Sequence, residues 1–161
     1  MIENYSKYID ETIKLIENTM FATIATANKN GDVSASKVTI VNDGLDIYFQ
    51  TDSSFEKAKN IKENNKIAIN LGATYAKGIA EIIGKPIQNE MFINKMKKKN
   101  IHTYNDYSKL ENEVLIKVVL TEIRIWKYDK IDGKTEEYLI IIDLNNKISN
   151  KIKLDNMSYY E

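Results

Sequence analysis

The 161-residue sequence contains no cysteine, a single histidine and a single proline. Without cysteine the chain cannot form a disulfide, a thiolate zinc site or a catalytic thiol. A lone histidine, His102, argues against a multi-histidine metal site and against a histidine-dependent proton relay. These absences exclude a disulfide scaffold and the commonest metal-centred and thiol chemistries.

Long hydrophobic runs are also missing. No apolar run approaches the ~18 residues of a membrane span, and the N-terminal stretch lacks the basic start and unbroken apolar core of a signal peptide. Positive and negative residues balance at 23 each, so no strong attraction to nucleic acid is expected. We therefore expect a cytoplasmic protein that binds neither membrane nor nucleic acid. Its length fits a single domain over residues 1–161, with the polar residues 145–161 forming a loose C-terminal tail.

The first third of the sequence predicts one helix and three strands. Residues 2–18 carry isoleucines at steps of four and three, which is typical of an amphipathic helix. Residues 20–27 (MFATIATA) and 33–41 (VSASKVTIV) flank an NKNGD turn, and residues 45–51 (LDIYFQT) follow an NDG turn. These strands predict a three-stranded antiparallel meander.

The rest of the sequence predicts further strands and two helices. Ser53 and Glu56 fit a capping box that opens a helix ending near residue 63, and Pro86 interrupts the chain before a second helix. The remaining elements are expected at residues 66–71 (strand), 76–83 (strand), 88–99 (helix), 113–128 (one bent strand or two joined strands) and 134–144 (strand). Many strands, short turns and few helices indicate a mainly β protein, a closed antiparallel barrel with peripheral helices.

The most informative stretch for chemistry is TDSSFEK at residues 51–57. A helix start presents free N–H groups and a partial positive charge. Hydroxyls from Thr51 and Ser54 and the ammonium of Lys57 could add donors, and together these groups could hold a phosphate dianion. Taken alone, the spacing fits an ordinary capped helix with a solvated lysine better, because Ser and Lys are common at such places.

An ordered series of segments resembles one known family. The series comprises FATIATANKNGDVSASKVTIVNDGLDIYFQTDSSFEKAKNIKENNKIAINL, then KGIAE, then IRIW. In content and order it is similar to the FMN-binding split barrel of the pyridoxamine 5′-phosphate oxidase-like superfamily, whose pattern is FATLAT, a D-G hairpin, YFxT, S-x-K-xxN, V-x-G-x-A-E and a strand closing on Trp. The resemblance covers residues 15–128 and implies an antiparallel, Greek-key-like split barrel.

The same resemblance implies an FMN site, with FAD and F420 ranked behind FMN. Residues 36–39 would line the flavin from the second strand, residues 50 and 51 would lie near ring and phosphate, and residues 54 and 57 would hold the phosphate. The tryptophan would lie near the flavin, supplied by the other subunit of a homodimer that binds flavin at its interface. The implied cofactor-binding residues are Ser36, Lys37, Val38, Thr39, Gln50, Thr51, Ser54, Lys57 and Trp126.

The sequence departs from the family pattern at two places. Family members often carry Arg where Ser36 stands, and Lys37 replaces that charge only if its side chain reaches the same site, because adjacent strand residues point to opposite faces. True pyridoxamine-phosphate oxidases also carry an Arg-x-His pair soon after the Trp. Here that stretch reads KYDKIDGK, and the only arginine, Arg124, precedes Trp126. The specific vitamin B6 reaction is therefore disfavoured.

We expect an FMN-dependent oxidoreductase acting on a small, unidentified substrate, because the flavin would carry the chemistry and the protein would bind and orient it. No catalytic residue and no metal site is predicted. One alternative is a reductase of nitroimidazole or stress-related type in the same superfamily. Another is a non-catalytic flavin-binding or small-ligand-binding barrel. A heme-degrading relative would be expected to carry His-rich or basic extensions, which the sequence lacks.

Two further features leave alternatives open. The lysines of KMKKK at residues 95–99 are either cations placed at a helix C-terminus or a site for an anionic ligand. If the active site opens toward this helix, Lys95, His102 and Tyr104 are the residues to test. The terminal Tyr159 and Tyr160 either fold over a site or have no fixed structure.

Overall fold

The computed structural model describes residues 3–154, so the predictions for Tyr159 and Tyr160 lie outside the described residues. None of the helices in this part of the chain is long and apolar enough to cross a membrane. The elements in chain order are α1 (Glu3–Asn18), β1 (Phe21–Ala27), β2 (Val33–Thr39), β3 (Val41–Asp43), β4 (Asp46–Asp52), α2 (Glu56–Glu63), β5 (Lys66–Leu71), β6 (Thr74–Gly84), η1 (Pro86–Gln88), α3 (Glu90–Lys99), α4 (Ile101–Asp106), β7 (Glu113–Ile131), β8 (Lys134–Asp143) and β9 (Ile148–Lys153).

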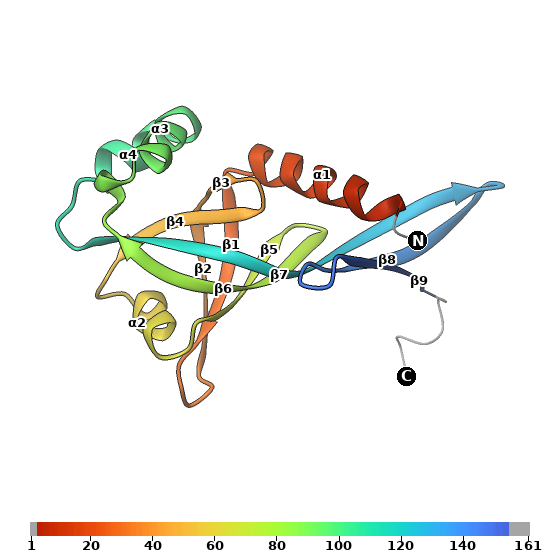
Figure 1. Ribbon diagram of the computed structural model, residues 1–161, viewed down its shortest axis with the longest axis horizontal. Coiled ribbons are helices and arrows are strands. Elements are labelled where there is room, and N and C mark those ends of the chain that lie inside the picture. Colours follow the sequence, from red (N-terminus) through yellow and green to blue (C-terminus); the bar gives the residue numbers. More distant parts are fainter. Residues whose placement is uncertain (1–2, 155–161) are drawn as a thin grey trace.

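The strands form one antiparallel sheet in the order β2-β1-β5-β6-β7-β4-β3, and β8 and β9 continue from β7 (Figure 1). The two strands at the ends of the seven-strand path, β2 and β3, follow each other in the chain and are separated only by Ile40. The sheet therefore curves round but does not close through hydrogen bonds. The prediction of a mainly β, antiparallel split barrel with peripheral helices is confirmed, whereas the prediction of a closed barrel is wrong.

The predicted meander is also wrong in its last pairing. β1 and β2 form the expected hairpin around the NKNGD turn, and β3 and β4 form a second hairpin. The chain leaves the first hairpin at Ile40, which is fully buried and whose N–H donates to Met20 O at 3.0 Å. β4 then pairs with β7 instead of β2. The sequence run VSASKVTIV thus contains two strands, because one buried residue redirects the backbone between them.

The long segment predicted at residues 113–128 is a single strand, β7. It pairs with β4 and β6 along its first part and with β8 along its second part. The β6–β7 register shifts between Lys77 and Gly78 and again between Ile82 and Gly84. Such shifts bend a strand and increase its twist, so β7 curves out of the barrel and continues as an extension (Figure 1).

Two hydrophobic cores hold the elements together. The larger core fills the inside of the curved sheet and includes Ile24, Phe49 and Ile116. The smaller core lies under α3, where Phe92 and Met96 pack against neighbours on β3, β4 and β7. Each fully buried side chain of this size stabilises the fold by about 1.5–3 kcal/mol relative to exposure.

The N-terminal helix lies where the sequence predicted it, but its buried face differs slightly from the predicted one. Its most buried residues are Tyr8, Thr12 and Ile16, whereas Ile13 is only half-buried. Tyr8 and Ile16 belong to the larger core. The isoleucine spacing alone did not identify Tyr8 and Thr12 as buried residues. Both can be buried, because the tyrosine ring is largely apolar and the Thr12 hydroxyl donates to the Tyr8 carbonyl at 2.7 Å.

The C-terminal part forms a ribbon that projects from the barrel (Figure 1). β7 and β8 are joined by a tight turn at Asp132 and Gly133, both with positive φ, as a two-residue hairpin turn requires. β9 pairs with β8 from Ile148 to Lys153, so the loose tail expected after residue 145 is incorrect over that stretch. Its polar residues are compatible with a strand because they lie at the exposed edge of the ribbon.

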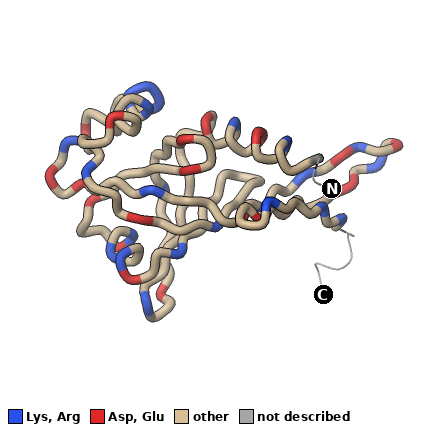
Figure 2. The backbone as a smooth tube through the Cα atoms, in the orientation of Figure 1, with Lys and Arg blue, Asp and Glu red and all other residues tan. Residues whose placement is uncertain are grey.

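Lysines and acidic residues are interspersed over most of the molecule (Figure 2), in keeping with its zero net charge. The clearest concentration of one sign is the last turn of α3, which holds Lys97, Lys98 and Lys99.

We predict that Gly78→Ala lowers the free energy of unfolding by about 1–3 kcal/mol, the usual cost of overpacking. A Cβ at this position would lie 2.7 Å from Val119 O and 2.8 Å from Val118 Cγ1, so backbone would have to move. Urea denaturation followed by circular dichroism measures the change. The neighbouring exposed Lys77→Ala is the control and should change stability by less than about 0.5 kcal/mol. Equal stability of Gly78→Ala and wild type would contradict the close-approach interpretation.

Candidate functional site

A cavity of about 360 Å³, here called the main cavity, opens where β4 ends and α2 begins. It lies between β2, the start of β7 and the segment around α4. Its lining residues are Lys37, Val38, Thr39, Gln50, Thr51, Asp52, Phe55, Lys57, Thr103, Tyr107 and Glu113.

The main cavity brings together six of the nine residues that the sequence singled out, on β2, β4 and α2. Ser36 and Ser54 lie instead in an adjoining hollow of about 350 Å³, which shares Phe55 and Lys57 with the main cavity. Ser36 turns away from Lys37 because neighbouring strand residues point to opposite faces. The six residues in the main cavity are Lys37, Val38, Thr39, Gln50, Thr51 and Lys57.

The start of α2 differs from the predicted capping box. The helix begins at Glu56, its N-cap is Phe55, and no side chain caps it. Asp52 instead organises the turn that leads into the helix, accepting the Ser54 N–H at 2.7 Å. Hydrogen bonds from Ser54 hold the pKa of Asp52 below its usual value. A helix start without a side-chain cap leaves backbone donors for a ligand, and anions are the ligands that such donors favour.

Lys57 is the second residue of α2 and lies in its first turn. Its Nζ donates to Thr51 Oγ1 at 3.4 Å and lies 4.9 Å from the centre of the Phe55 ring. Partial burial lowers its pKa, while the negative charge of Glu113 opposes that shift. The ammonium therefore has one weak side-chain partner and can donate to a ligand as well.

Gln50 carries a buried donor with no partner. Its side chain is 9% exposed, and its Oε1 accepts the Ser108 hydroxyl at 2.6 Å. That hydrogen bond fixes the orientation of the amide, yet Nε2 has no hydrogen-bond partner. An unsatisfied buried donor costs about 1–3 kcal/mol, and a ligand that accepts from this N–H would remove that cost.

Glu113 is a site residue that the sequence analysis missed. It is the first residue of β7, is only 6% exposed, and is the cross-strand partner of Asp52. Burial and the negative charge of Asp52 raise its pKa to about 7, against the opposing charge of Lys57. Its Oε2 has no hydrogen-bond partner. A glutamate before an apolar strand gives no signal in the sequence, because only the β4–β7 pairing places it beside Asp52.

Lys37 does not take the place of the arginine that family members often carry at position 36, because Lys37 lines the main cavity and Ser36 lines the adjoining hollow. Lys37 lines the main cavity together with Lys57. The Nζ atom of Lys37 lies 4.2 Å from the centre of the Phe21 ring, and attraction between the cation and the ring face holds it there. Two lysines from different elements therefore line this cavity, together with the carboxyl groups of Asp52 and Glu113.

Trp126 does not approach the main cavity of its own chain. It lies on the β7 extension, thirteen residues after Glu113, with its side chain 45% exposed. At the usual strand rise of ~3.3 Å per residue, the two positions are roughly 40 Å apart along the strand. The prediction that this tryptophan reaches a flavin from a second subunit remains a prediction.

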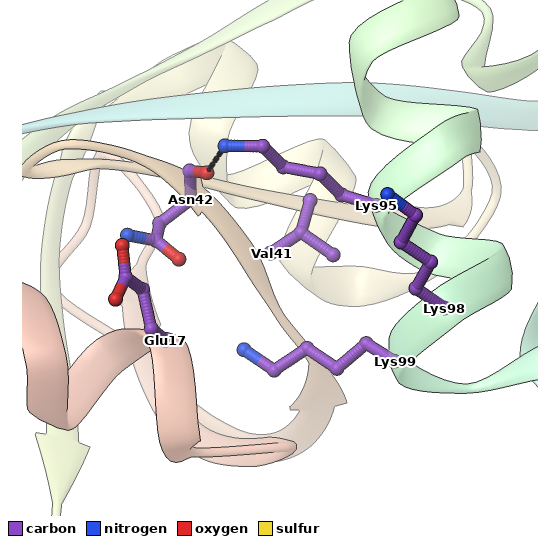
Figure 3. A pocket seen from close by; sticks show the side chains of 6 residues that line it. All are labelled: Glu17, Val41, Asn42, Lys95, Lys98 and Lys99. Atoms are coloured by element: carbon purple, nitrogen blue, oxygen red, sulfur yellow. Dashed lines mark hydrogen bonds between the residues drawn. The ribbon is translucent and has the colours of Figure 1, made fainter.

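A second cavity of about 370 Å³ lies between α1, β3 and α3 and contains three lysines (Figure 3). Lys95 donates to the Asn42 carbonyl, and Lys99 donates to the Ile16 carbonyl at 2.9 Å. Burial lowers the pKa of Lys99 to about 8, with the charge of Lys95 adding to the shift and that of Glu17 opposing it. Lys95 and Lys99 thus attach α3 to β3 and to the end of α1, which accounts for the position of these two lysines without a ligand.

The helix α4 contributes to the main cavity, but through other residues than expected. Thr103 and Tyr107 line it, and the Thr103 hydroxyl lies 3.2 Å from that of Thr39. His102 is exposed, whereas Tyr104 packs against the smaller core under α3. The main cavity faces this helix, although Lys95, His102 and Tyr104 are not among the residues that line it.

Comparison with solved structures supports the same architecture. A Clostridium acetobutylicum protein related to general stress protein 26 of Bacillus subtilis matches with a TM-score of 0.63 and 16% identity, covering 88% of this chain and 98% of that one. HutZ, the heme storage protein from Vibrio cholerae, matches with a TM-score of 0.58 and 15% identity over 69% and 88% of the two chains. An F420 reductase matches with a TM-score of 0.51 and 20% identity over 68% and 93%.

These likenesses define the class of protein as a split barrel of the type that those three structures share. Residues 9–127 match the family described as pyridoxamine 5′-phosphate oxidase. The chain therefore belongs to the pyridoxamine 5′-phosphate oxidase family, as the sequence predicted, although it is not a clear example of the true oxidase. No curated protein matches the sequence.

Proposed function

We propose that this protein binds FMN in the main cavity and is an oxidoreductase that acts on a small substrate. The observation that carries the proposal is the convergence of Gln50, Thr51 and Lys57 at the uncapped start of α2. The unpartnered Gln50 N–H, the Lys57 ammonium and the backbone donors of α2 are all suited to an acceptor-rich, anionic group. A flavin phosphate has that chemistry.

The residues present fit FMN better than a cofactor without a terminal phosphate. Lys37 adds a second positive charge on the β2 side, and Val38 and Thr39 would lie against the flavin ring. When bound, the flavin would supply the redox chemistry, passing electrons between a small donor such as a nicotinamide and an acceptor. The chain's own part would be to hold the phosphate, orient the ring and restrict the access of water.

The first test is the absorption spectrum of the purified protein, followed by identification of any chromophore released on denaturation. We expect a flavin band near ~450 nm from FMN, as the cofactor-borne chemistry requires. Turnover of NADH or NADPH by the flavin-loaded protein would then separate an enzyme from a non-catalytic flavin-binding barrel. A colourless protein that also fails to bind added FMN would rule out the proposed site.

We predict that Lys57→Ala weakens FMN binding by about 10- to 100-fold, the effect of losing one charged hydrogen-bond donor worth about 1.5–3 kcal/mol. Titration with FMN followed by quenching of flavin fluorescence measures the dissociation constant. The matched control is Lys59→Ala, since Lys59 is an exposed lysine on the same helix. Unchanged affinity of Lys57→Ala, or an equal loss in both variants, would count against the phosphate assignment.

We further propose that the functional unit is a homodimer. The outer face of the sheet carries an apolar patch that includes Val33, Ile79 and Val119, of which Val33 is 78% and Val119 47% exposed. Ile79 and Val119 are cross-strand partners, and Ala25 pairs with both Ala35 and Ala68 beside them. Such a flat patch of small and branched side chains is typical of a surface that another subunit covers.

We predict that Val119→Lys converts a dimer into a monomer, because an interface of ordinary size buries only about 800 Å² per partner and cannot easily accommodate a buried, unpaired charge. Light scattering coupled to size-exclusion chromatography measures the mass. Ile87→Lys, which places the same charge at an exposed isoleucine of η1, is the control and should remain dimeric. A monomeric wild-type protein at high micromolar concentration would overturn the dimer proposal.

A further inference from the structure

Two carboxylates lie directly opposite each other beside the main cavity. Asp52 ends β4, Glu113 begins β7, and the two are cross-strand partners. Cross-strand partners point to the same face of a sheet, and like charges in such a pair are destabilising. Glu113 nevertheless is buried, and no ion pair or hydrogen bond to its Oε2 exists among residues 3–154. No partner among the described residues therefore compensates for the burial of this oxygen.

The environment shifts the pKa values of the two carboxyls in opposite directions. Asp52 receives hydrogen bonds from Ser54, and its pKa is lowered. Burial and the charge of Asp52 raise the pKa of Glu113 to about 7. Pairs of carboxyls whose environments push their pKa values apart commonly divide into a charged and a neutral partner.

The other charged and titratable groups that line the cavity come from three directions. Lys57 on α2 favours the charged form of Glu113. Lys37 on β2 and the Tyr107 phenol after α4 complete the set on the elements packed around the cavity. A phosphate dianion bound at Lys57 would therefore add negative charge beside Glu113, which strengthens the preference of Glu113 for its neutral form.

We propose that Glu113 binds the ligand phosphate in its protonated form, donating its O–H to a phosphate oxygen, so that binding of the phosphate is coupled to uptake of one proton. The inference rests on the proposed FMN site and extends it. It gives the unpartnered Glu113 oxygen a hydrogen-bond role, and it makes Glu113 and Gln50 two neutral donors that complement the charged Lys57. Specificity would then be for a phosphomonoester and not for a flavin without phosphate.

The direction of the pH effect follows from linkage. Free Glu113 has a pKa of about 7, so above this value the free protein has lost the proton that the complex retains. Affinity should therefore fall as pH rises above 7, approaching a tenfold loss per pH unit for one coupled proton. Below pH ~6 the phosphate itself becomes protonated, so the measurements belong between pH 6.5 and 8.5.

The test is isothermal titration calorimetry of the full chain with FMN at pH 7.5, in two buffers of different ionisation enthalpy, with dissociation constants also measured at pH 6.5 and 8.5. We expect uptake of between half and one proton and an affinity at least tenfold higher at pH 6.5 than at pH 8.5. Glu113→Gln, which keeps a neutral donor, should bind with little pH dependence and no proton uptake. Glu111→Gln, a change at an exposed glutamate in the preceding loop, should behave as the wild type.

The outcomes separate this inference from the function on which it rests. If wild-type protein binds FMN equally well across this pH range without taking up a proton, the proposed function stands and the role of Glu113 is overturned. Proton uptake that persists in Glu113→Gln places the proton elsewhere and also overturns it. If wild-type protein binds FMN at none of these pH values, both proposals fail. Circular dichroism shows whether Glu113→Gln folds. If it does not, the pH dependence and proton uptake of the wild-type protein alone test the role of Glu113.

Discussion

The rest of the structure depends on backbone hydrogen bonding along both edges of β7. This strand pairs with β4 and β6 where it runs through the barrel and with β8 where it leaves it. Its register places Glu113 opposite Asp52 at one end and Trp126 on the extension at the other. Since a slip of one residue would turn every side chain to the opposite face, the cavity, the core and the outer patch are all fixed by the same register.

The register is maintained at a point of close backbone approach. Gly78 on β6 lies against β7, and no larger residue fits there without displacement of Val119 or Val118. The shift of register beside Gly78 gives the curvature that brings the far ends of the sheet toward each other. The sheet can then remain open between β2 and β3, because the single buried residue Ile40 links them covalently and supplies apolar contacts on the inner side.

Local patterns in the sequence predicted most of the elements but not how they pair. The segment KIAINL is a strand as expected, since its alternation is a property of neighbouring residues. The division of VSASKVTIV into two strands, by contrast, depends on β4 finding β7, a contact between residues far apart in the chain. The prediction of a capping box at Ser53 was wrong for a similar reason. Asp52 at the end of β4 accepts a hydrogen bond from the Ser54 N–H and organises the turn instead.

The candidate site was predictable to the extent that it consists of short motifs. Gln50, Thr51 and Lys57 could be proposed from a resemblance, since a strand end followed by a helix start is a local arrangement. Glu113 could not, because its importance comes from the carboxylate across the strand pair and from burial. The sequence also could not reveal that Gln50 keeps an unpartnered N–H, which depends on the position of the Ser108 hydroxyl.

In the chain without a ligand, several groups that line the main cavity are in energetically unfavourable environments. They are a buried donor without an acceptor, a buried carboxyl opposite another carboxylate, and a partly buried ammonium. Each of these features costs free energy in isolation, and an anionic group that accepts from Gln50 and Lys57 would relieve several of them together. The β7 extension has the complementary feature of an exposed tryptophan far from its own cavity. In the homodimer proposed above, the exposed Trp126 of one chain would be available to the main cavity of the other.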